Sequence, residues 1–363
     1  MLISYGWSET LQRDFAPFAA QGLAPARVIV QQRGLYRLAT EAGEMEGRIS
    51  GRFAHEAQLQ AIGGGYPVTG DWVAVEPKDG LAVIVQVLSR ATAFTRGAAG
   101  TSNARQVVAA NVDTALLTAS LNADLNLRRL ERYLATAYES GAAPVIVLTK
   151  ADLCGEAAGL VAAVEAIAFG VPVLAVSAAT GQGLDALSAQ LSPGRTAVLL
   201  GSSGVGKSTL VNALAGAELM ATRAIREDDA HGRHTTTHRE LIRLPSGALI
   251  LDTPGMRELA LWDAEAGVAA VFGDVTAEVE RLARDCRFRD CAHGREPGCA
   301  VRAALEDGTL DTGRWRSFQK LQRELAYAVR KEDPEAAAAE RRRWIAIHKA
   351  GRARMHAKRE WDD

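Results

Sequence analysis

The chain has 363 residues, of which 48% are hydrophobic, and this length is enough for two or three separate cores. Its formal net charge is −1, from 42 basic and 43 acidic residues. No apolar run approaches the roughly 20 residues that a membrane helix needs, and the first residues lack the basic and apolar regions of a signal peptide. We expect a cytoplasmic, monomeric protein without a membrane partner.

Short apolar, β-branched runs alternate with glycine-rich turns over residues 27–95. The runs are RVIVQQ, LYRLAT, DWVAVEP and LAVIVQVL. This pattern predicts a small antiparallel barrel or sandwich, and five short strands would fit an OB-type barrel. The small and polar residues 96–106, RGAAGTSNARQ, are predicted to form a linker.

From residue 111 the chain alternates strand patterns with helical patterns. Strands are predicted in VDTALLTAS, APVIVLTK and PVLAVSA, and helices in LRRLERYLATAYES and near residues 156–169. The series continues through TAVLLGSSGVGKSTLVNALAG and ends at ALILDTPG. Such alternation predicts a parallel sheet with crossover helices. Beyond Trp262 the pattern is helical.

A phosphate-binding pattern, GSSGVGKST, follows the apolar strand TAVLL and opens a helix. Its glycines let backbone N–H groups surround phosphates, Lys207 reaches the terminal phosphates and Ser208 binds magnesium. Asp252 ends a second apolar strand, where it can hold the magnesium through water, and the N–H of Gly255 suits the γ-phosphate. The predicted loop comprises Gly201, Ser202, Ser203, Gly204, Val205, Gly206, Lys207, Ser208 and Thr209.

Two further segments predict that the base is guanine. The carboxylate of Asp152 in TKAD can accept the two parallel N–H donors of guanine, while Lys150 lies along the base. The backbone at Ser177-Ala178, again directly after a strand, can donate to the guanine carbonyl oxygen. Each segment alone is weak evidence for guanine binding, since a surface Lys-Asp turn is common. Both segments, however, lie at strand ends beside a phosphate loop, and this joint placement favours guanine binding. The predicted base site comprises Thr149, Lys150, Ala151, Asp152, Ser177 and Ala178.

A cysteine and histidine cluster, CRFRDCAHGREPGC, spans residues 286–299. It holds three of the four cysteines, whereas Cys154 stands apart and is predicted to be a reduced thiol. Four sulfur and nitrogen donors close a tetrahedral structural zinc site. The predicted zinc ligands are Cys286, Cys291, His293 and Cys299. The arginines of the loop are predicted to face RNA phosphates, and they are Arg287, Arg289 and Arg295.

The segment HGRHTTTH, residues 231–238, lies where the first switch of a GTPase should be. A threonine there completes the magnesium shell, and Thr236 is favoured, with Thr235 and Thr237 as alternatives. A metal site formed by the histidines is the minor interpretation. Met256 stands where many GTPases have a water-orienting glutamine, so we expect slow intrinsic hydrolysis.

Both base segments precede the phosphate loop, whereas ordinary small GTPases have the opposite order. With GSSGVGKST, DTPG, GRHTTT and the CX4CXHX5C cluster, the chain resembles the ribosome small-subunit-dependent GTPase A family of circularly permuted bacterial GTPases over nearly its whole length. The resemblance implies a role in late maturation of the small ribosomal subunit, hydrolysis stimulated by that subunit, and a water-positioning role for His234. Thr149 departs from the usual asparagine; its hydroxyl still supports the loop, and lower base affinity is expected.

The expected fold is multidomain, with an N-terminal OB-fold barrel, a permuted α/β P-loop GTPase domain and a mainly helical zinc-binding domain. The boundaries are residues 1–100, 101–265 and 266–340, followed by a basic tail over 341–363 with eight Lys/Arg against three acids. The expected activity is hydrolysis of GTP to GDP and phosphate, with Mg²⁺ and one structural Zn²⁺, and the expected partner is the small ribosomal subunit with its rRNA. Alternatives are a P-loop ATPase or kinase, and a nucleotide-regulated RNA-binding scaffold with negligible turnover.

Overall fold

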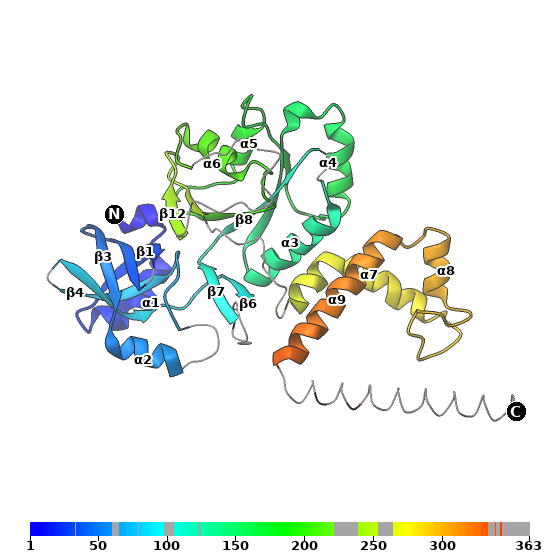
Figure 1. The fold of residues 1–363 in the computed structure, drawn as a ribbon, viewed down its shortest axis with the longest axis horizontal. Helices are drawn as coiled ribbons and strands as arrows, with labels where there is room; N and C mark the ends of the chain where they lie inside the picture. The colour runs from blue at the N-terminus through cyan, green and yellow to red at the C-terminus, as the bar shows by residue number, and fades with distance from the viewer. Residues whose placement is uncertain are drawn as a thin grey trace, which may run out of the picture.

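The computed structural model describes most of the chain. The described residues are 1–32, 34–59, 65–78, 80–97, 105–122, 125–220, 239–252 and 264–332, with the single positions 338 and 342. Figure 1 shows three bodies in chain order: a small barrel, a central sheet surrounded by helices, and a group of helices. Among the described residues, no helix is both long and apolar enough to cross a membrane.

The N-terminal body is a closed barrel of five strands, as predicted for an OB-type fold. Its strands run in the order β1-β2-β3-β5-β4, and pairing of β1 with β4 closes the ring. β3 and β5 are parallel, and the other neighbours are antiparallel. The strands are β1 (Ala24–Gln32), β2 (Leu35–Thr40), β3 (Gly43–Ile49), β4 (Trp72–Lys78) and β5 (Leu81–Val87).

Alternate residues of these strands form two apolar layers. Side chains such as Val28, Leu38 and Ile84 fill the barrel, while Ile29 and Trp72 belong to a second cluster that includes the N-terminal helices. The sequence pattern did not predict β3, because its one buried position is Gly47, which packs against Leu38. The helices of this body are η1 (Leu2–Tyr5), α1 (Glu9–Ala19) and α2 (Gly51–Leu59).

The central body contains the predicted parallel sheet. Its strand order is β10-β9-β8-β11-β13-β12, and only β12 is antiparallel to its neighbour within this body. The strands are β8 (Thr114–Ser120), β9 (Ala143–Thr149), β10 (Val173–Ala175), β11 (Thr196–Leu200), β12 (Arg239–Arg243) and β13 (Leu249–Asp252). The helices are α3 (Leu127–Ser140), η2 (Ala151–Leu153), α4 (Ala157–Glu165), α5 (Leu184–Ser188) and α6 (Lys207–Ala215).

Helix α3 has the bounds that the sequence predicts. Asn126 caps its first turn by accepting the Arg129 N–H at 3.1 Å, and Gly141 ends it with a φ of 83°. Apolar residues recur along one face, and Leu130 and Leu134 are almost fully buried. The helix therefore joins the core along one side and presents charged residues on another.

The segment between barrel and sheet differs from the predicted linker. Its two ends belong to β6 (Ala93–Gly97) and β7 (Arg105–Ala110), which pair as an antiparallel ribbon. The linker interpretation is therefore wrong at both ends. The linker ends carry polar or small residues with weak strand propensity, and only the pairing of the two segments brings them into a ribbon, where the Arg96 guanidinium donates to Gln106 Oε1.

The C-terminal body is helical, as predicted, and comprises α7 (Glu265–Ala283), α8 (Ala300–Glu306) and α9 (Thr312–Glu332). Figure 1 shows α7 and α9 beside α3 of the central body. The approach of α7 to α3 is close at Gly267, where a Cβ atom would lie 2.1 Å from the carbonyl oxygen of Ala135. Glycine at this position thus allows the two helix backbones to meet.

Candidate nucleotide and metal sites

The phosphate loop connects β11 to α6, as predicted. Gly204 and Gly206 have φ angles of 76° and 93°, in the left-handed region that favours glycine. The backbone N–H groups of Gly204, Gly206 and Ser208 donate to no acceptor among the described residues. A row of such groups at a helix N-terminus is a site for a phosphate group.

A close approach of β8 and two hydrogen bonds of Lys207 fix the shape of this loop. A Cβ atom on Gly201 would lie 2.4 Å from the carbonyl oxygen of Thr118, so β8 approaches the loop directly. The Nζ atom of Lys207 donates to the carbonyl oxygens of Gly201 at 2.8 Å and Ser202 at 2.6 Å. The ammonium group is therefore already placed across the loop.

The TKAD segment is fastened to the phosphate loop. Thr149 is 4% exposed, and its Oγ1 lies 2.5 Å from the carbonyl oxygen of Val205 and 3.2 Å from that of Ala119. Lys150 adopts a left-handed φ of 60°, and its Nζ donates to the carbonyl oxygen of Gly204 at 2.9 Å. The tertiary structure thus brings together two predicted motifs that are far apart in sequence.

Asp152 lies in η2, directly after these anchoring residues. Its side chain is exposed and forms no hydrogen bond or ion pair with any residue that the structure describes. The neighbouring Ala151 is buried, and its N–H donates to the carbonyl oxygen of Val176 at 3.1 Å. The backbone is therefore fixed while the carboxylate can accept a ligand's N–H groups.

The Ser177-Ala178 turn divides its polar groups between the protein and the site. Ser177 is fully buried, its N–H donates to Gln182 O at 2.9 Å, and its Oγ accepts the Thr180 N–H at 3.2 Å. The N–H of Ala178 donates to no described residue. Of the two predicted positions, Ala178 is thus the one with a backbone donor available to a base.

Asp252 is the last residue of β13, which is the parallel neighbour of β11. The carboxyl ends of both strands therefore meet at one edge of the sheet, where the phosphate loop begins. The remaining predicted residues of the nucleotide site lie outside the described residues. They are Gly255, Met256, His234 and Thr236, with the alternatives Thr235 and Thr237.

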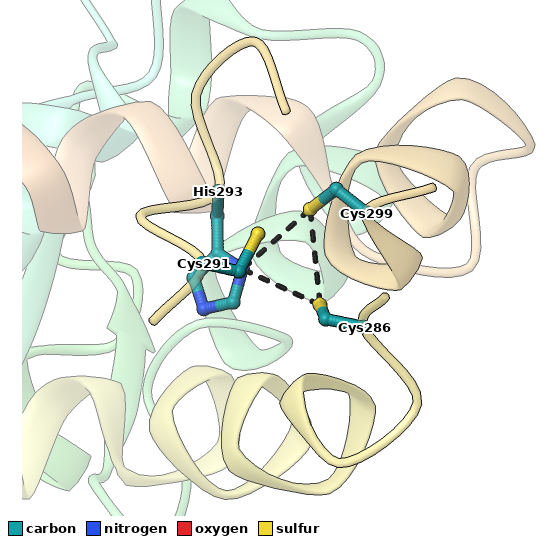
Figure 2. A group of neighbouring side chains, drawn as sticks. All are labelled: Cys286, Cys291, His293 and Cys299. Carbon is teal, nitrogen blue, oxygen red and sulfur yellow. Dashed lines mark hydrogen bonds between the residues drawn. The ribbon is translucent and has the colours of Figure 1, made fainter. Parts of the chain in front are cut away.

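The four predicted zinc ligands meet in the C-terminal body, as Figure 2 shows. Their donor atoms all lie within 4.8 Å of one another. The Sγ atoms of Cys286 and Cys299 are 3.9 Å apart, and Nδ1 of His293 is 3.7 Å from the first and 3.5 Å from the second. Tetrahedral zinc with bonds of about 2.3 Å to sulfur separates two thiolates by about 3.8 Å, so the cluster has the donor set and spacing for this ion.

Comparison with known proteins assigns the chain to a family. Residues 87–262 match the sequence model of the RsgA GTPase family. A protein from Opitutus terrae named small ribosomal subunit biogenesis GTPase RsgA is 49% identical, over 99% of this chain and 100% of its own. A protein of the same name from Streptomyces avermitilis is 47% identical, over 99% of this chain and 95% of its own. This chain belongs to the RsgA GTPase family.

Solved structures agree with this assignment to the RsgA family. YjeQ from Thermotoga maritima is 26% identical and superposes with a TM-score of 0.58, covering 84% of this chain and 98% of its own. YloQ, described as a circularly permuted GTPase, is 23% identical, has a TM-score of 0.54 and likewise supports the fold. The predicted resemblance and the permuted GTPase fold are therefore confirmed.

Sequence reasoning did not single out Arg129, which contacts the phosphate loop of this RsgA GTPase. Its Nη1 donates to Oγ of Ser202 at 2.6 Å. The pair borders a small cavity behind the loop, lined by Thr118, Ala119, Asn126, Arg129, Leu130, Tyr133, Ser202 and Val205. No motif marks the arginine in LRRLER; only the position of α3, after the strand next to β11, indicates such a contact.

Glu296 is a second residue near a predicted site that the sequence did not reveal. Its carboxylate accepts the N–H groups of Ala292 at 3.3 Å and Gly294 at 2.7 Å. Backbone N–H groups, its own and that of Gly294 foremost, lower the pKa of Glu296. The ionised carboxylate thus shapes the loop around His293, whose φ is 59°. The sequence signal for this role is the presence of an acidic residue between the cysteines of the cluster.

Proposed function

We propose that this RsgA-family protein hydrolyses GTP to GDP and phosphate in the maturation of the small ribosomal subunit. The observation that carries the proposal is the attachment of the TKAD segment to the phosphate loop, through Thr149 on Val205 and Lys150 on Gly204. A bound nucleotide has its base at one segment and its phosphates at the other. The named role of the relatives from Opitutus terrae and Streptomyces avermitilis supports the cellular process.

At the phosphate end, the loop N–H groups and Lys207 receive the β- and γ-phosphates. Ser208 and Asp252 are the proposed magnesium residues, the latter through water, with Thr236 completing the shell. Magnesium, when bound, neutralises charge on the β- and γ-phosphates. His234 is the proposed water-positioning residue, on the family resemblance, because a neutral imidazole can accept a hydrogen bond from the attacking water.

At the base end, three groups receive guanine. The Asp152 carboxylate accepts both N–H groups of its Watson–Crick edge, which adenine does not present as a pair. The stem of Lys150 lies along one face of the ring, and the Ala178 N–H donates to O6. This arrangement supports GTP over ATP and disfavours the alternative of an ATPase or kinase.

In the C-terminal body, we propose one structural zinc ion. Three thiolates and one imidazole complete a tetrahedron and leave no position for a substrate. The loop arginines Arg287, Arg289 and Arg295 and the basic residues of 341–363 are proposed to meet phosphates of the rRNA. Contact with the small subunit is further proposed to stimulate hydrolysis.

Hydrolysis of GTP, with ATP as control, tests this function in the presence of purified small subunits, large subunits or an unrelated structured RNA. We expect turnover of GTP alone, with stimulation by small subunits alone. Lys207→Ala should lower stimulated kcat by about 100-fold or more, because a preorganised cation at the phosphates is lost. Lys78→Ala, at an exposed lysine at the end of β4, is the matched control.

Equal turnover under every condition would contradict stimulation by the subunit. Tight GTP binding with negligible turnover, even with small subunits present, would instead favour the nucleotide-regulated scaffold. Binding of ATP as strong as that of GTP would overturn the assignment of the base site.

A further inference from the structure

The hydroxyl group of Thr149 is fully committed to the protein. Thr149 is buried, and its Oγ1 lies 2.5 Å from the carbonyl oxygen of Val205 and 3.2 Å from that of Ala119. A threonine hydroxyl has one hydrogen, and neither carbonyl can supply another. The single hydrogen of Thr149 is therefore shared between two backbone acceptors and is not available to a nucleotide.

An asparagine, the usual residue of GTPases at this position, has a different capacity. Its side chain carries two N–H donors and one carbonyl acceptor. One N–H can hold a loop carbonyl while the second still donates to a ligand. Thr149 can perform the first task and not the second, because its donor lies on Cβ and is already engaged.

Guanine presents two acceptors, N7 and O6, on the edge opposite its N1–H and N2–H donors. Asp152 serves the donors, and the available Ala178 N–H serves O6. The Nζ of Lys150 is held on Gly204 O, and Ser177 is fully buried. Among the described residues, the side chains of this base site therefore present no in-plane donor for N7.

We propose that Thr149 makes this protein read guanine without its N7 atom. The inference rests on the proposed guanine-nucleotide site and adds its specificity: recognition depends on the N1–H, N2–H and O6 groups, and N7 contributes nothing. Thr149 is thus a specificity-determining residue: it keeps the hydrogen bond to the phosphate loop and makes no contact with N7. A guanine nucleotide in which a C–H group replaces N7 binds as tightly as GTP.

Competition titrations with full-length protein and Mg²⁺ test this proposal. GTP and 7-deaza-GTP each displace a GDP that carries a fluorescent group on its ribose. We expect Kd values that agree within about twofold, because no protein hydrogen bond is lost. Thr149→Asn should introduce a preference for GTP of roughly 3- to 10-fold, the value of one neutral hydrogen bond.

Thr149→Val is the matched control, since it removes the hydroxyl and adds no donor. It should weaken the binding of GTP and of 7-deaza-GTP equally, because the hydrogen bonds to Val205 and Ala119 are lost and no contact to the base is removed. ITP, which lacks the 2-amino group, should bind the unaltered protein more weakly than GTP because Asp152 loses one donor. This result would show that the assay reports contacts to the base.

Weaker binding of 7-deaza-GTP to the unaltered protein, by fivefold or more, would overturn the inference and leave the GTPase proposal standing. An unchanged ratio in folded Thr149→Asn would also overturn it. Absence of GTP and GDP binding would instead overturn the proposed function itself, and the inference with it. If Thr149→Asn fails to fold, the comparison in the unaltered protein decides.

Discussion

At the scale of single residues, Gly201 lies so close to β8 that a side chain cannot fit. Its Cβ position is 2.4 Å from the carbonyl oxygen of Thr118, and that atom belongs to the strand backbone. Lys207 Nζ also uses the Gly201 carbonyl as an acceptor. A change at this glycine therefore displaces the loop and the lysine together.

Gly201→Ala should weaken GTP binding by about tenfold or more, which is about 1.4 kcal/mol, because the new methyl group pushes the loop from β8. Titration with a fluorescent GTP analogue measures the change. Gly159→Ala is the matched control: this glycine lies inside α4, nothing is within 4 Å of its Cβ position, and alanine favours a helix. Equal affinities of all three proteins would show that the close approach does not matter for binding.

At the scale of elements, α3 connects the phosphate loop with the C-terminal helices. On one side Arg129 donates to Ser202 of the loop. On another, the fully buried Glu131 accepts hydrogen bonds from Ser317 Oγ at 2.5 Å and Arg314 Nη1 at 3.4 Å, both from α9. Burial raises the pKa of Glu131, although the Ser317 hydroxyl and the neighbouring arginines act in the opposite direction.

Glu131→Ala should lower the free energy of unfolding by about 3 kcal/mol, because it leaves the largely buried Arg314 without one of its two acidic partners. Urea denaturation measures the loss. Glu165→Ala, at an exposed position of α4, should change stability by less than about 0.5 kcal/mol. A stability loss at Glu131 no larger than at Glu165 would mean that the buried network contributes nothing to stability.

At the scale of the whole molecule, the barrel and the central sheet are physically continuous. β1 pairs with β12 at Val30↔Glu240 and Gln31↔Arg239, which joins the two bodies into one sheet. The buried Arg27 of the barrel donates to Thr196 Oγ1 of β11 at 2.8 Å, and to the carbonyl oxygen of Tyr5. Burial lowers the pKa of Arg27 to about 10. These contacts make the relative position of the two bodies part of the fold.

Removal of the proposed zinc ion should increase local unfolding in the C-terminal body. A strong chelator, or Cys299→Ser, should remove about one zinc ion per chain and increase hydrogen exchange over residues 286–306, because the metal supplies folding energy there. Barrel and central-sheet exchange should stay unchanged. Cys154→Ser, outside the cluster, should retain the ion. Metal analysis that finds no zinc in freshly purified protein, and a chelator without effect on exchange, would contradict the site.

The sequence by itself determined the features whose chemistry is local. GSSGVGKST, TKAD and the cysteine cluster each need residues only a few positions apart, and the alternation of strands and helices follows from periodic burial. The helix predicted over LRRLERYLATAYES likewise has the bounds of α3. The strand pattern predicted a barrel or sandwich, and the order of the motifs together with the family resemblance predicted the permuted GTPase fold.

Only the tertiary structure decided which distant groups meet. The hydroxyl of Thr149 reaches Val205, Arg129 reaches Ser202, and Glu131 is buried against α9. β3 and the ends of the ribbon of β6 and β7 also escaped prediction, because β3 buries a glycine and the ribbon ends pair polar or small residues such as Arg96 and Gln106. A sequence pattern indicates whether a residue is buried or lies in a turn. The partner of a hydroxyl or guanidinium group, however, depends on how the strands and helices pack in space.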